Sequence, residues 1–198
     1  VLFGRDAEVA ACLQRLSGPN PPPLVVTGPS GGGKSSLVRA GVLPRLRLQQ
    51  GTKVLVPVEP GDSPLRRVAL TLTSDQSGDQ LASDIEELVV DVDGFAAAID
   101  RSIAGGARRV VLFLDQAEDL VSRGKPEVSR LVDRLARVDP ERLVVIAAVR
   151  SASLDDWLRE PALAWFSGAD PIWVRPMDRA ATTTRTSATR PTTAESSE

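Results

Sequence analysis

Apolar residues along this chain fall into two kinds of segment, short continuous runs and longer stretches with helical spacing. Arg109 to Asp115 and Leu143 to Val149 are runs of the first kind, which are typical of strands buried on both faces of a parallel sheet. The predicted strands are residues 24–27, 53–58, 109–115, 143–149 and 172–174, of which 53–58 is predicted from alternating apolar and polar residues. The predicted helices are residues 6–16, 36–43, 65–72, 81–90, 95–103 and 127–138. Strands that alternate with helices imply right-handed crossovers, so the predicted fold class is α/β, a three-layer sandwich with a mostly parallel sheet.

The end of the chain has a different composition. From Ala180 onward it is rich in Thr, Ser, Ala and Arg and contains no Leu, Ile, Val or aromatic residue. Such a segment cannot bury enough apolar surface to fold. We therefore predict one domain over residues 1–179 and a disordered tail over residues 180–198. Because the sequence opens at Val1 without a methionine, we expect it to be a piece of a longer protein.

The most informative motif is the octet between the first predicted strand and the helix that follows it. It reads Gly-Pro-Ser-Gly-Gly-Gly-Lys-Ser, which matches the phosphate-binding loop of nucleoside triphosphatases. Glycines allow the backbone N–H groups to fold around phosphate, and Lys34 supplies a compact positive charge for the β- and γ-phosphates. The Ser35 hydroxyl is a ligand for Mg²⁺, and the helix directs its positive end at the same anion. The residues predicted to bind nucleotide are Gly28, Pro29, Ser30, Gly31, Gly32, Gly33, Lys34, Ser35 and Ser36.

A second part of the site is predicted about eighty residues later. Asp115 ends a buried strand, and ligands of open α/β sheets bind at the carboxyl edge of the strands. An acid at that edge can hold Mg²⁺ opposite Ser35, directly or through water. The alternative is that Asp115 only caps a helix.

The group that activates water is left open between two residues. Gln116 occupies the place where many phosphate-loop ATPases carry a glutamate, and a glutamine can orient water without accepting its proton. Glu118 could serve as the base if the chain turns it toward the γ-phosphate, although solvation at the surface would explain an acid there almost as well. Arg150 follows another buried strand, so a γ-phosphate contact by its guanidinium is predicted, with an exposed loop arginine as the alternative.

Composition excludes several other classes of function. The chain holds one cysteine and no histidine, which excludes His/Cys zinc sites, histidine-dependent triads and an internal disulfide, and suits a reducing, cytoplasmic location. A net charge of −2 gives no electrostatic case for nucleic acid as the main partner. No apolar run is long enough to span a membrane. The sole asparagine, Asn20, precedes the loop, so a guanine-reading Asn-Lys-x-Asp motif is excluded and ATP is the expected nucleotide.

Together these motifs resemble the bacterial novel STAND nucleotide-binding domains, which are signal-transducing ATPases with numerous domains. The matching stretches are Phe3 to Glu8, Gly28 to Pro44, Pro60 to Leu65, Leu112 to Leu120, Ala148 to Ser151 and Val174 to Met177. Their order and spacing cover residues 1 to about 179. The resemblance implies an AAA+/STAND-like phosphate-loop fold.

The resemblance also implies a function, an ATP-dependent switch that hydrolyses slowly and uses Mg²⁺. It implies that Gly4 and Arg5 lie in a helix closing over the base and that Arg150 senses the γ-phosphate. Self-association and partner effector and sensor domains outside this chain are implied as well. Two alternatives stay open on the residues alone, a phosphate-loop kinase of small molecules or nucleotides and a nucleotide-binding scaffold that never hydrolyses.

Overall fold

Five parallel strands in the order β2-β3-β4-β1-β5 form the centre of the computed structural model, which describes residues 4–74, 85–86, 88–89, 91–104, 106–122 and 125–176. The strands are β1 (Leu24–Gly28), β2 (Thr52–Val54), β3 (Arg109–Leu114), β4 (Leu143–Arg150) and β5 (Ile172–Trp173). Every pair in this sheet is parallel, as the alternation of strands and helices predicts.

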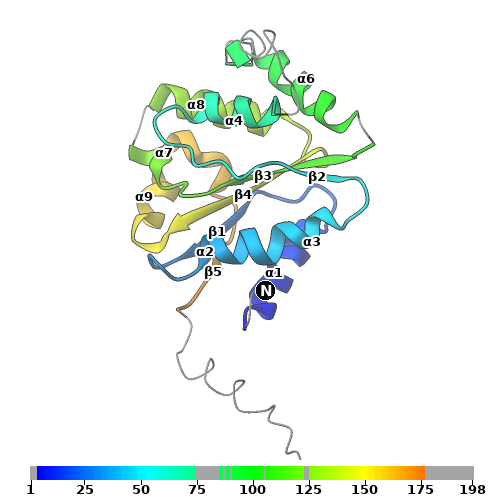
Figure 1. The fold of residues 1–198 in the computed structure, drawn as a ribbon. Helices are drawn as coiled ribbons and strands as arrows, with labels where there is room; N and C mark the ends of the chain where they lie inside the picture. The colour runs from blue at the N-terminus through cyan, green and yellow to red at the C-terminus, as the bar shows by residue number, and fades with distance from the viewer. Residues whose placement is uncertain are drawn as a thin grey trace, which may run out of the picture.

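Helices cover both faces of the sheet (Figure 1). On one face lie α1 (Asp6–Leu16), α2 (Lys34–Ser36) and α3 (Leu43–Arg47), and on the other lie α4 (Pro64–Leu72), α6 (Val92–Ile103) and α8 (Lys125–Arg137). The shorter elements are α7 (Asp119–Ser122), α9 (Leu154–Arg159) and the 3₁₀ turns Ser151–Ser153 and Pro161–Phe166. The predicted three-layer sandwich is therefore confirmed.

The strand residues divide between two hydrophobic clusters, one on each side of the sheet. In β4, Val145, Ala147 and Val149 pack with residues of α4, α6 and α8, whereas Val144, Ile146 and Ala148 pack with residues of α1 and α3. Alternate residues of one strand thus face opposite layers, and both faces are apolar. This is why β3 and β4 are continuous apolar runs in the sequence.

Several predicted elements have different limits in the structure. The helices α6 and α8 begin at Val92 and Lys125, a few residues earlier than predicted, and two other elements differ more. The strand expected over residues 53–58 is regular only from Thr52 to Val54, because Pro57 has no N–H for the ladder, although Val58 still forms a single bridge with Leu114. The helix after the glycine-rich loop extends from Lys34 to Arg47, and its middle, Leu37–Val42, is π-helical. Pro44 lacks the N–H that would close the next α-helical turn, and wider turns before it accommodate that loss.

Residues 75–84 lie outside the described part of the chain, so most of the helix expected over residues 81–90 and part of the preceding loop are not described. The tail expected over residues 180–198 is also outside it. Within the described residues, no helix is long and apolar enough to cross a membrane.

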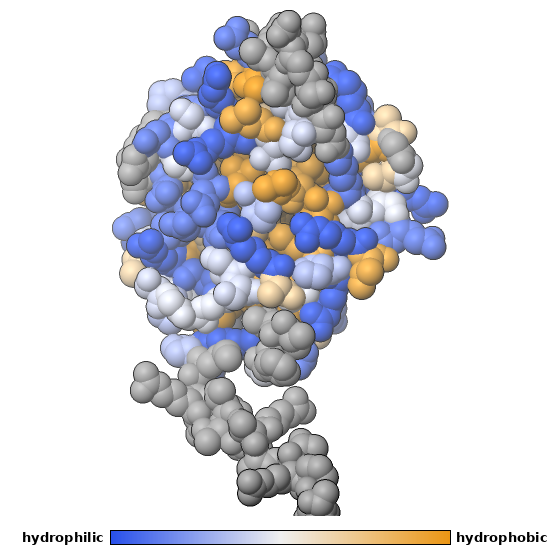
Figure 2. Space-filling model, viewed as in Figure 1, coloured by the Kyte–Doolittle hydropathy of each residue, from blue (hydrophilic) through white to orange (hydrophobic). Residues whose placement is uncertain are grey.

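Hydrophilic residues cover much of the face seen in Figure 2, and apolar residues gather across its middle. Four large apolar side chains among the described residues are substantially exposed, namely Leu48, Val56, Leu70 and Trp173.

Candidate functional site

The glycine-rich loop connects the end of β1 to the start of α2 at the carboxyl edge of the sheet. Gly31 and Gly33 have φ angles of 70° and 89°, which side chains with a Cβ rarely adopt. Gly33 is the N-cap residue directly before α2, so the loop ends where the helix presents its unpaired N–H groups. These two glycines have the backbone freedom that the motif predicts.

Gly28 is required for a different reason. It is the last residue of β1, and a Cβ built on it would lie 2.3 Å from the backbone oxygen of Val174. The chain leaving β5 therefore passes so close to the first residue of the loop that a side chain has no room. The sequence motif alone assigns this glycine to phosphate, whereas the structure adds a packing constraint.

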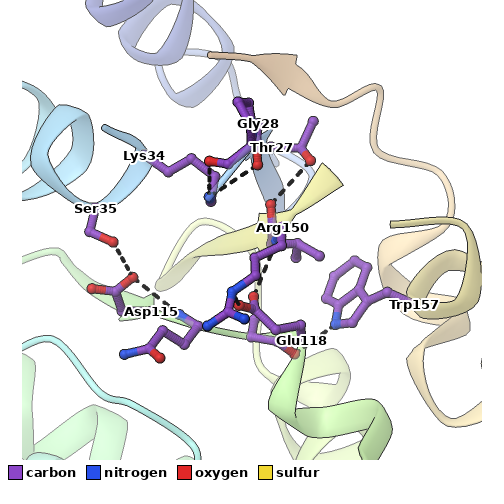
Figure 3. Close-up of polar contacts among 12 residues, drawn as sticks. Thr27, Gly28, Lys34, Ser35, Asp115, Glu118, Arg150 and Trp157 are labelled. Carbon is purple, nitrogen blue, oxygen red and sulfur yellow. Dashed lines mark hydrogen bonds and ion pairs between the residues drawn. The ribbon is translucent and has the colours of Figure 1, made fainter. Parts of the chain in front are cut away.

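Lys34 lies under the loop with its side chain directed back at the backbone (Figure 3). Its Nζ donates hydrogen bonds to the carbonyl oxygens of Gly28 and Pro29, both at 3.0 Å, and the residue is buried. Burial lowers the pKa of Lys34, and the negative charge of Glu118 acts in the opposite direction. The ammonium group is thus held against the backbone at the start of the loop.

Ser35 and Asp115 are brought together as predicted. The Ser35 hydroxyl donates a 2.7 Å hydrogen bond to Oδ1 of Asp115, which follows β3 and is almost fully buried (Figure 3). A hydroxyl and a carboxylate are oxygen donors of the kind that Mg²⁺ prefers, and this ion usually takes few protein ligands because it keeps several waters. The pair therefore fits a magnesium site. The described residues contain no cluster of three or more His, Cys, Asp or Glu side chains that could hold a metal by themselves.

Glu118 and Arg150 form an ion pair beside the loop. Nε of Arg150 lies 2.7 Å from Oε1 of Glu118, and the Arg150 backbone N–H donates to Oε2 at 3.2 Å. The Glu118 side chain is 10% exposed and that of Arg150 is 52% exposed. Arg150 pairs in register with Gly28 because β4 lies next to β1, which places the guanidinium at the edge where the loop begins. The two side chains whose roles the sequence leaves open are thus in direct contact.

The segment between Asp115 and Glu118 is fixed by backbone contacts. Gln116 has a φ of 55°, is partly exposed, and donates its backbone N–H to Oδ1 of Asp115 at 3.1 Å. The buried indole of Trp157 donates a 2.9 Å hydrogen bond to the Ala117 carbonyl, and the Ala117 N–H donates to the carbonyl of Ala148 at 2.8 Å. This sharp turn directs Glu118 back toward β4 instead of into solvent.

Arg5 holds the backbone of the glycine-rich loop through its guanidinium. Its buried guanidinium donates to the backbone oxygens of Gly32 at 3.1 Å and Arg175 at 2.5 Å, and it pairs with Glu8 at 2.8 Å. It therefore joins the start of the chain, the loop and the segment after β5. The resemblance implies that Gly4 and Arg5 lie in a helix, but both precede α1, which begins at Asp6 with Arg5 as its N-cap. The part of Arg5 in holding the loop backbone is visible only in three dimensions.

Arg39 is a site residue that sequence reasoning misses. Its Nε and Nη2 both lie 3.0 Å from Oδ2 of Asp115. The available signal is helical spacing, since Arg39 is four residues after Ser35 and falls on the same face of the helix.

Comparison with known protein families gives a match. A family model described as Novel STAND NTPase 1 matches residues 1–196. Comparison of the sequence with curated proteins gave no match.

Several solved structures share the fold. The ORC2 protein of Aeropyrum pernix, solved as ADPNP-ADP complexes, is similar with a TM-score of 0.66 and 16% identity over 87% of this chain and 48% of that chain. A Walker-type ATPase of Pyrococcus abyssi gives a TM-score of 0.56 and 18% identity over 90% and 55% of the two chains, and Cdc6p of Pyrobaculum aerophilum gives 0.57 and 12% over 88% and 46%. At these identities the likeness concerns the fold, and this chain spans about half the length of each neighbour.

Proposed function

Since the chain belongs to the Novel STAND NTPase 1 family, we propose that it binds ATP with Mg²⁺ and acts as a switch that hydrolyses ATP slowly. The observation that carries the proposal is the convergence of Lys34, Ser35, Asp115 and the Glu118–Arg150 pair at one edge of the sheet. The positive charges of Lys34 and Arg150 and the carboxylates of Asp115 and Glu118 all lie at the edge where phosphates would bind. Positioning and charge neutralisation of this kind are the main requirements of phosphoryl transfer.

In the proposed mechanism each residue has a separate task. The loop N–H groups and Lys34 bind the phosphates, while Ser35 and Asp115 would hold the magnesium ion. When bound, that ion would neutralise phosphate charge. Water attacks the γ-phosphorus, Glu118 accepts the proton of that water, and the bond between the γ-phosphorus and the bridging oxygen breaks to give ADP and phosphate.

The contact between Glu118 and Arg150 suggests how the site could respond to the triphosphate. Arg150 is half exposed and can turn toward a γ-phosphate, whereas Glu118 is buried and stays near its position. A γ-phosphate would compete for the guanidinium and leave the Glu118 carboxylate free to accept a proton. ADP, which lacks that group, would leave the ion pair closed.

The scaffold alternative is favoured by one observation. Gln116 directly follows Asp115, and Glu118 is engaged with Arg150, so a chain that binds ATP without turnover is a second candidate. Phosphate release from ATP without any acceptor separates the candidates, because only a hydrolysing switch releases phosphate under these conditions.

Binding is tested with a fluorescent ATP analogue. Lys34→Ala should abolish saturable binding, because it removes the positive charge that would bind phosphate. It also removes two hydrogen bonds to the Gly28 and Pro29 carbonyls, so the free energy of unfolding should fall by roughly 1–2 kcal/mol while the protein stays folded. Arg66→Ala, which removes a positive charge from an exposed position of α4, is the matched control and should bind normally. Unchanged affinity in Lys34→Ala would refute the phosphate-loop assignment.

Further parts of the proposal concern what lies around this domain. We expect a cytoplasmic switch that acts through self-association or through effector and sensor domains beyond residues 1–198. The limit of the nucleotide-binding domain at residue 179, with a disordered tail over residues 180–198, stays a prediction.

A further inference from the structure

The guanidinium of Arg39 is in close contact with Asp115, the carboxylate that the proposed function assigns to magnesium. Both Nε and Nη2 lie 3.0 Å from Oδ2 of Asp115, the oxygen that Ser35 does not use. The Asp115 side chain is 4% exposed and that of Arg39 is 44% exposed. Both oxygens of this buried carboxylate are therefore engaged, one by a hydroxyl and the other by a guanidinium.

A second acid lies near the same guanidinium nitrogen, Nη2 of Arg39. Oε1 of Glu59 is 3.7 Å from Nη2 of Arg39, and the Glu59 side chain is half exposed. The backbone fixes this neighbour, because Asp115 donates its N–H to the carbonyl of Val58 at 2.8 Å and Val58 bridges to Leu114. Arg39 thus has a close partner in Asp115 and a looser one in Glu59.

A divalent cation at Ser35 and Asp115 would bring a charge of +2 next to this guanidinium. The two positive charges repel each other, and both are attracted to the one buried carboxylate, so they compete for Asp115. An arginine cannot relieve the conflict by losing its proton. It can do so by turning toward Glu59, because its side chain is long and its head is partly exposed.

We propose that Arg39 is a positioning residue that holds Asp115 before a divalent cation binds and moves toward Glu59 when the cation arrives, so that the Arg39–Asp115 pair sets the cation affinity of the site. This inference rests on the magnesium role of Asp115 in the proposed function. It adds that cation binding changes the contacts of Glu59. This residue follows β2, which is an edge strand and is separated from β1 by β3 and β4.

The test is a Mn²⁺ titration of the nucleotide-free protein, followed by the electron paramagnetic resonance signal of free Mn²⁺. Arg39→Gln should bind Mn²⁺ about tenfold more tightly than the wild type, since it removes a competing charge next to Asp115. Glu59→Gln should bind two- to threefold more weakly by the same Coulomb argument, because Arg39 loses its other partner. Arg45→Gln removes the same charge from a helix position that contacts Asp6 and the Gly41 carbonyl, and it should match the wild type.

Each outcome decides between the two proposals. If Arg39→Gln binds Mn²⁺ no more tightly than the wild type, whether or not the wild type binds it measurably, the role of Arg39 is refuted. If Glu59→Gln binds as tightly as the wild type, Glu59 is not the second partner. If Asp115→Asn binds as well as the wild type, the magnesium assignment of the proposed function fails instead. Should Arg39→Gln not fold, Arg39→Lys decides, because an ammonium group cannot reproduce both contacts and should give intermediate tightening.

Discussion

Replacing Gly28 by alanine tests whether the first glycine of the loop is needed for packing as well as for phosphate. The added Cβ would lie 2.3 Å from the Val174 oxygen and 3.3 Å from the Val174 carbonyl carbon. Carbon and oxygen atoms do not approach within 3.0 Å in this way, and the obstacle is backbone, so β1 and the segment after β5 must separate. The Val174 N–H donates to the Thr27 carbonyl at 2.7 Å, and that hydrogen bond would be stretched or lost.

The expected cost follows from these contacts. Overpacking against a rigid neighbour costs about 1–3 kcal/mol, and loss of one buried backbone hydrogen bond adds roughly 1 kcal/mol. We expect Gly28→Ala to lower the free energy of unfolding by about 2–4 kcal/mol. For a domain of this size such a loss lowers the melting temperature by about 5–15 °C.

The assay is thermal and urea unfolding without nucleotide, with two other glycines as controls. A Cβ at Gly18 meets nothing within 4 Å, and its φ is not positive, so Gly18→Ala should be neutral within about 0.5 kcal/mol. Gly31 has equally open space but a φ of +70°, so Gly31→Ala should cost about 1–2 kcal/mol from backbone strain alone. If Gly28→Ala has the same free energy of unfolding as Gly18→Ala, the packing argument is wrong and phosphate binding is the only reason for this glycine.

Two further predictions concern Glu118 and Cys12. In single-turnover hydrolysis, Glu118→Gln should bind ATP but slow cleavage by about 10²–10⁴-fold, because it removes the proton acceptor, whereas Gln116→Ala should have a smaller effect. The reverse pattern would assign water activation to Gln116. Burial raises the pKa of the Cys12 thiol from 9.0 to about 11, so the folded state holds this proton more tightly than the unfolded state. Its stabilising contribution is complete below about pH 9 and is lost toward pH 11, and urea unfolding should show the wild type losing about 2 kcal/mol more than Cys12→Ala over that range. If the free energies of unfolding of the wild type and Cys12→Ala change with pH in parallel, the raised pKa of Cys12 is contradicted.

Much of the fold is predictable because apolar runs and helical spacing respond to burial in a simple way. The run from Arg109 to Leu114 is a strand with apolar contacts on both faces, and α1 begins and ends where its pattern predicts. The order of the strands is not written in such patterns. Only the structure shows that β4 lies between β1 and β3. This order places Arg150, at the end of β4, between the glycine-rich loop after β1 and Asp115 after β3.

The candidate site divides in the same way. Lys34, Ser35 and Asp115 are predictable because phosphate and magnesium restrict the residue types at fixed places along the chain. The contact of Arg39 with Glu59 depends on the bridge between Val58 and Leu114, and the contact of Arg5 with Arg175 joins residues 170 positions apart. Contacts of this kind follow from tertiary packing, so no local sequence pattern predicts them.

The position of β1 in the sheet has a consequence for how the protein is made. Both neighbours of this strand, β4 and β5, are synthesised long after Leu24–Gly28. At translation rates of roughly 5–20 residues per second, Leu24–Gly28 must wait on the order of ten seconds on the ribosome before β4 has emerged. During that time an apolar strand and the helix after it have no sheet to join. We therefore expect chains stalled before residue 143 to depend on chaperones, and β1 to be among the last strands of the sheet to find its partners.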